Sequence, residues 1–148
     1  MTILDIPELS GLEGMRAVMR GELPPPPMAL LMGMTILELE EGSVVFGALP
    51  GEQHYNPIGM VHGGLAATLI DSATGCAVHT LLPAGQGYAT IDLHVNFDRP
   101  ITSGTGPVRC AGTVVNKGAK IATAEARLTS ERTGKLLAHG SATCMLIG

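Results

Sequence analysis

Apolar and polar residues alternate along much of this chain, which is the two-residue period of a β-strand. In residues 89–97, ATIDLHVNF, the alternation is strict, with Ile91 on an apolar face and Thr90 on a polar face. Six segments are predicted to be strands, at residues 36–40, 44–49, 89–97, 108–115, 121–129 and 136–147. Short turns such as EGS, NKGAK and SERTGK separate several of them, so the pattern predicts antiparallel pairing.

One long segment, residues 62–82, has a different pattern and is predicted to be a helix that Pro83 ends. Its apolar residues cover nearly the whole circumference, so other structure must wrap it. Asp71 and His79 interrupt the apolar run, which favours a helix buried in protein over one that spans a membrane. Small residues dominate one face of the last two strands and allow a sheet to close tightly around this helix: Ala122, Ala124, Ala126, Ala138, Gly140 and Ala142.

The first residues form a separate unit in this interpretation. Ser10 and Glu13 have the spacing of a capping box, and apolar residues follow at helical spacing up to Gly21. Four prolines, Pro24 to Pro27, prevent the helix from continuing. We therefore expect a leading helix and proline-rich link over residues 1–27 and one α+β domain over residues 28–148, with no internal repeat.

Composition narrows the function classes. The 148 residues carry a net charge of −4 and only 3% aromatic residues, which argues against a general nucleic-acid or anionic-membrane binder. Three widely spaced cysteines without a CxxC motif, and no visible signal peptide, indicate the reducing cytoplasm. Neither the histidines nor the cysteines have the spacing of a ligand set, so we expect no metal and no cofactor.

Candidate chemistry gathers around the start of the long helix. Gly63 and Gly64 expose backbone N–H groups at the positive end of the helix dipole, a position that suits the oxyanion of a thioester or ester intermediate. The alternative is that both glycines serve only close packing. His62, at the N-cap position, is expected to orient the loop rather than to act as a general base.

Asp71 lies within the apolar helix, where an unpaired charge is costly. A carboxylate in such a place can act as a base or a nucleophile. Alternatively, it caps another element or pairs with an arginine such as Arg99.

The run N-x-x-G-x-x-HGG-x-x-x-x-L-x-D from Asn56 to Asp71, the strand ending NFDRP and the turn NKGAK resemble the hotdog-fold acyl-CoA thioesterases of the phenylacetate-degradation (PaaI) type. The resemblance covers about residues 28–148. It implies a long central helix wrapped by an antiparallel sheet of about six strands, assembled into dimers and often tetramers, and metal-free hydrolysis of acyl-CoA. It further implies that Gly63 and Asn56 polarise the carbonyl, and that Asp71 attacks or activates water with help from Thr90.

Eight residues separate Gly63 from Asp71, so their backbones stand about 12 Å apart along one helix. One thioester carbon cannot ordinarily touch both, which predicts antiparallel helices from two subunits and two composite sites. Simple alternation turns Thr90 away from the helix, so it would reach a site only at a subunit boundary. Lys117, Lys120 and Arg99 are candidates for the CoA phosphates. A non-catalytic acyl-CoA-binding protein and a hydratase or dehydratase of the same fold remain the alternatives.

Overall fold

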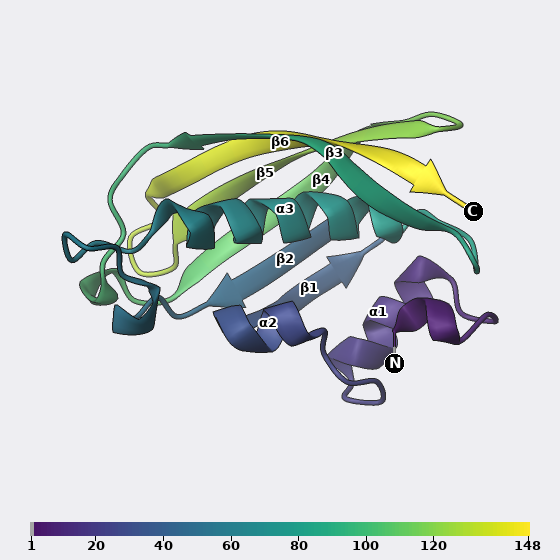
Figure 1. The fold of residues 1–148 in the computed structure, drawn as a ribbon, viewed down its shortest axis with the longest axis horizontal. Coiled ribbons are helices and arrows are strands. Elements are labelled where there is room, and N and C mark those ends of the chain that lie inside the picture. Colours follow the sequence, from purple (N-terminus) through teal and green to yellow (C-terminus); the bar gives the residue numbers. More distant parts are fainter. Residues whose placement is uncertain (1) are drawn as a thin grey trace.

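The computed structural model describes residues 2–148 and confirms the α+β architecture. Six antiparallel strands form one sheet in the order β1-β2-β4-β5-β6-β3, and it curves around the long helix α3, Gly63–His79 (Figure 1). The strands are β1 Met34–Glu40, β2 Ser43–Ala48, β3 Gly87–Phe97, β4 Val108–Lys117, β5 Ile121–Ser130 and β6 Leu136–Ile147. The short 3₁₀ turns are η1 Ile3–Asp5, η2 Glu52–His54 and η3 Ser103–Thr105. All six strands therefore lie where the sequence pattern predicts them.

Helix α3 is enclosed because the strands that face it carry very small residues. Ala122, Ala124, Ala126, Ala138 and Ala142 are all buried, as the small-residue pattern predicts. A Cβ at Gly112 would lie 2.3 Å from the carbonyl oxygen of Ala73, so the backbone of β4 touches that of the helix there. The helix ends at His79, a few residues before the predicted Pro83 boundary. Among residues 2–148, no helix is long and apolar enough to cross a membrane.

The N-terminal residues pack against the domain that follows them. Helix α1, Gly11–Met19, begins with the predicted capping box, in which the Ser10 hydroxyl accepts from Glu13 N at 3.2 Å. Its first N–H donates to the carbonyl of Leu82 just beyond α3, and Met15 is buried in the main core. A second short helix, α2, Pro27–Met32, was not expected from the sequence; Pro27 occupies its first turn, where a proline's missing N–H costs nothing.

A β-bulge in β3 corrects one sequence prediction. Thr90 pairs with Cys144 and Asp92 with Thr143, so Ile91 is the extra residue and has no partner on β6. The bulge changes which residues face the helix. Ile91, predicted to face the core, is 54% exposed, while Thr90 turns toward α3 within the same subunit. The expectation that Thr90 points away from its own helix is therefore wrong.

Candidate active site

Asp71 and Thr90 form a hydrogen-bonded pair between α3 and β3. The Thr90 hydroxyl donates to Oδ1 of Asp71 at 2.8 Å, and both residues are partly accessible to solvent. Within residues 2–148 the second carboxylate oxygen has no hydrogen-bond partner. The Arg99 guanidinium donates instead to the carbonyl of Leu136 at 2.7 Å, so the alternative pairing of Asp71 with Arg99 does not occur. One carboxylate oxygen of Asp71 thus remains available to bind water or substrate on the side of α3 that is partly accessible to solvent.

Asn56 organises the loop that leads to α3. Its side-chain oxygen accepts the N–H groups of Ile58 at 3.1 Å and Met60 at 3.0 Å, and its backbone bonds to Met60 and Gly59 close the same turn. Gly59 has a φ of +79°, which only glycine adopts without strain. Because both neighbours of the oxygen are donors, the amide nitrogen of Asn56 points away from the turn and can donate to another group.

His62 caps the helix, as the sequence indicates. Its side-chain Nδ1 accepts the N–H of Gly64 at 2.7 Å, while the backbone N–H of His62 donates to the carbonyl of His54. The Gly64 N–H therefore already donates to His62. It is not free to bind substrate in the way the sequence led us to expect. Gly63 differs: within residues 2–148 no acceptor lies on its N–H. One unpartnered donor remains at the positive end of α3.

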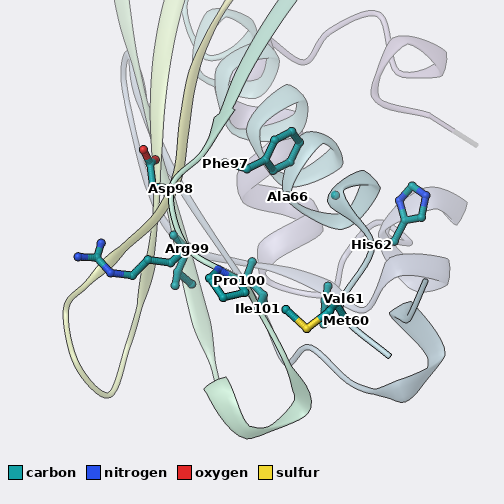
Figure 2. A pocket seen from close by; sticks show the side chains of 11 residues that line it. Met60, Val61, His62, Ala66, Phe97, Asp98, Arg99, Pro100 and Ile101 are labelled. Carbon is teal, nitrogen blue, oxygen red and sulfur yellow. The ribbon is translucent and has the colours of Figure 1, made fainter. Parts of the chain in front are cut away.

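A pocket of about 310 Å³ opens beside this end of the helix (Figure 2). Its lining includes Gly63, Ala66 and the ring of Phe97, and a Cβ at Gly63 would lie 3.0 Å from that ring. Phe97 was not singled out from the sequence, because an aromatic at the end of an alternating strand is typical of core packing. Arg99 also lines the pocket, and its side chain points outward from the helix, as does Asp98 (Figure 2).

The structure does not bring all the predicted site residues together. Gly63 and Asp71 lie on one helix about 12 Å apart. The turn with Lys117 and Lys120 lies at the other end of α3: Val114 N donates to Gly42, and Gly42 N donates to the Thr80 hydroxyl at the helix C-terminus. Both lysines are exposed. Within one subunit the predicted site residues therefore form two separate groups.

Cys76 and Tyr88 lie beside Asp71 and were missed by sequence reasoning. Sγ of Cys76 is 4.0 Å from the Tyr88 hydroxyl. Burial, and more weakly the charge of Asp71, raise the pKa of the Cys76 thiol to about 12, and burial likewise raises the pKa of Tyr88. Both groups are neutral at physiological pH, so Cys76 is a poor nucleophile.

Metal chemistry has no candidate ligand set in the part of the chain that the structure describes, since no three His, Cys, Asp or Glu side chains cluster there. The candidate functional groups are instead the carboxylate of Asp71, the hydroxyl of Thr90, the amide of Asn56 and the N-terminus of α3. Together these groups can activate water and stabilise an oxyanion.

The wrapped helix and the groups beside it are those of a hotdog-fold thioester hydrolase. A family model described as Thioesterase superfamily matches residues 58–137, and the chain belongs to this family. Acyl-coenzyme A thioesterase 13 of Homo sapiens is 32% identical over 110 residues, which cover 74% of this chain and 77% of that protein.

Solved structures agree with this assignment. A phenylacetic acid degradation-related protein from Ralstonia eutropha is 28% identical, with a TM-score of 0.80 over 88% of this chain and 98% of that one. The PaaI protein of E. coli has a TM-score of 0.79 at 19% identity, covering 90% of this chain and 94% of that chain, and shows the shared fold. The resemblance drawn from the sequence motifs is confirmed.

Proposed function

We propose that this protein hydrolyses acyl-CoA thioesters as a homodimer in which each active site combines residues of both subunits. The observation that carries the proposal is the Thr90–Asp71 hydrogen bond on the open side of α3, in a chain of the Thioesterase superfamily. The acyl-coenzyme A thioesterase 13 relative supports the choice of acyl-CoA.

In this mechanism Asp71 either activates water for attack on the thioester carbonyl, or attacks it directly, expelling the CoA thiolate and forming an acyl anhydride that water then hydrolyses to the carboxylic acid and free Asp71. As a base, Asp71 takes a proton from water while Thr90 holds the carboxylate, and the new oxyanion accepts hydrogen bonds from Gly63 N–H and the Asn56 amide of the partner subunit. When the C–S bond breaks, the CoA thiolate takes up the proton that Asp71 holds, leaving a carboxylic acid and free thiol. His62 maintains the loop through its cap on Gly64.

The edge strand β3 supports assembly with a second copy. It is 11 residues long, lies at the end of the sheet order and exposes Ile91, Leu93 and Phe97. A long apolar edge strand invites pairing, and an isologous pair would join two sheets and set the α3 helices antiparallel. Such an arrangement overcomes the 12 Å separation of Gly63 and Asp71 within one helix, because Gly63 of each subunit would lie beside Asp71 of the other subunit.

The same arrangement divides the candidate phosphate-binding residues between subunits. Arg99 accompanies Gly63, whereas Lys117 and Lys120 lie beyond the C-terminal end of the helix that supplies Asp71. In an antiparallel pair, that end lies beside the loop before Gly63 of the other subunit. All three cations then flank one site.

The three cysteines, which form no disulfide within the described range, support a reducing, cytoplasmic location.

The two alternatives make different predictions. A hydratase needs a histidine and a carboxylate facing adjacent substrate carbons, but the His62 ring is committed to Gly64 and points away from the other pocket side chains (Figure 2). A non-catalytic acyl-CoA binder predicts tight binding without turnover. A thiol-release assay over a panel of acyl-CoAs separates them: hydrolysis supports the proposal, and stoichiometric binding without thiol release contradicts it.

Complementation tests the composite site. Asn56→Ala and Asp71→Asn subunits are co-expressed with different tags and the mixed dimers purified. One site of each mixed dimer carries both lesions and the other carries neither, so we expect about half of the wild-type activity per dimer. Each parent homodimer has one lesion in both sites and serves as the inactive control. Mixed dimers as inactive as their parents would mean that the two residues act within one subunit.

A further inference from the structure

A second cavity, of about 270 Å³, lies between α3 and the N-terminal residues. The N-terminal side is built by Ile3, Met15, Val18, Pro26 and Ala29. Ile36 and Phe46 of the hairpin β1–β2 form another wall. This N-terminal wall lies outside residues 58–137, the part that matches the family model.

The cavity adjoins the proposed catalytic pair. On the α3 side it is lined by Ser72, the residue after Asp71, and by Cys76 one turn further on. Tyr88 also lines it and stands two residues before Thr90 on β3, a distance of about 7 Å along a strand. Both Tyr88 and Thr90 point toward α3, since the Tyr88 ring occupies the space that a Cβ at Gly75 would need. The cavity therefore begins at the residues next to the Asp71–Thr90 pair, within reach of a group bonded to a carbonyl at Asp71.

The walls exclude charge. Burial lowers the pKa of His79, which also lines the cavity, and burial raises those of Cys76 and Tyr88, so all three side chains are neutral at physiological pH. Apart from the Ser72 hydroxyl, the remaining lining is hydrocarbon, thioether and proline. An ionised ligand group would lose its hydration here without gaining a charged partner, whereas an alkyl or aryl group would gain apolar contact.

The volume sets the size of the occupant. An apolar cavity of roughly 150 Å³ holds benzene, with six carbons, so a cavity of 270 Å³ holds about ten or eleven at the same filling. Resting on the proposed function, we propose that this cavity is the acyl pocket and selects uncharged acyl groups of about ten carbons. Val18 is a suitable wall residue to change, because it lies on α1 and lines both this cavity and the adjoining hollow into which a longer chain would continue.

The test compares Val18→Phe with Met19→Phe. Val18 is half-buried at the cavity, while its neighbour Met19 on α1 is exposed and does not line it. We expect Val18→Phe to lower kcat/KM for decanoyl-CoA at least about tenfold while acetyl-CoA changes less than about twofold, since differences of a few methylenes are of this size in apolar pockets. Met19→Phe should leave both substrates unchanged. Equal losses for both substrates in Val18→Phe would overturn the assignment.

Binding of decanoate, measured by calorimetry, separates this inference from the proposed function. Decanoate should bind wild type and Met19→Phe alike, and Val18→Phe at least about tenfold more weakly. If wild type hydrolyses no acyl-CoA, the proposed function is wrong, but the comparison of decanoate binding still shows whether the cavity binds an acyl chain. Unchanged decanoate binding in Val18→Phe refutes the acyl pocket. Should Val18→Phe not fold, Ala29→Leu fills the same cavity from α2, with exposed Leu31→Met as its control.

Discussion

The coupling between Asp71 and Thr90 can be measured by a double-mutant cycle. Thr90→Val removes the hydroxyl that donates to Asp71 at 2.8 Å and keeps the β-branched shape that strands favour. Asp71→Asn removes the charge and keeps the size of the side chain. If Thr90 acts through Asp71, the loss caused by Thr90→Val depends on whether the carboxylate is present.

The expected magnitudes follow from that single bond. A hydrogen bond to a charged group is worth about 1.5–3 kcal/mol, so Thr90→Val should lower kcat by about 10- to 150-fold in the wild-type background. Asp71→Asn should lose about 10²- to 10⁴-fold, the usual range for a positioned proton-transfer group. In the Asp71→Asn background, Thr90→Val should then cost less than about threefold, because the charge-assisted bond no longer exists.

Thiol release from decanoyl-CoA gives kcat for all four proteins, and thermal melts show that each variant is folded. Because the cycle compares ratios, a general loss of active protein would appear in the melts and not as coupling. If the two losses multiply, so that Thr90→Val costs the same in both backgrounds, Thr90 does not act through Asp71. Full activity in Asp71→Asn would remove the carboxylate from the mechanism altogether.

Three further predictions concern the helix start, metal and pH. Gly63→Val should fold yet lose at least about 10²-fold in kcat, because the valine side chain shields the backbone N–H and presses on the Phe97 ring. A wild-type kcat in this variant would show that the Gly63 N–H does not stabilise the oxyanion. EDTA should leave thiol release unchanged, and loss of activity restored by a divalent ion would contradict this. His79, whose folded pKa lies below its ordinary 6.5, adds stability that is complete above pH 6.5 and lost as pH falls from there toward the folded pKa. The Tm advantage of wild type over His79→Gln should therefore shrink on acidification below pH 6.5; a gap independent of pH would refute this effect.

Most of the fold could be predicted from the sequence because its strands and its long helix carry strong, different periods. The two-residue alternation located all six strands, and the apolar run with its small-residue partners located α3. Helix α2 escaped because its six residues are too few to show a period and begin with a proline that looks like a helix breaker. The docking of α1 escaped for another reason: Gly11 contacts His79, and no local pattern reports a contact between such distant residues.

The residues of the candidate site could be predicted from the sequence more fully than their arrangement in space. The cap by His62 and the exposed N–H of Gly63 follow from local helix-start chemistry, and both are present in the structure. The use of the Gly64 N–H by His62 depends on one rotamer, which the sequence does not specify. Likewise, the cavity at Val18 depends on how the leading segment lies across α3. Such features arise from packing between distant segments, so periodicity carries no signal for them.

The bulge at Ile91 shows how one residue changes the chemistry of a whole strand. Strict alternation over residues 89–97 assumes an uninterrupted ladder, and in such a ladder Thr90 shares a face with Asp92 and turns from the helix. The extra residue at Ile91 breaks that phase, so Thr90 faces Asp71 while the following residues of β3 keep their edge position. Ile91 is pushed outward onto the apolar edge where we place the second subunit. One local irregularity thus places the Thr90 hydroxyl on Asp71 and adds an apolar residue to the proposed interface, so the proposal links assembly of the dimer to the geometry of its active site.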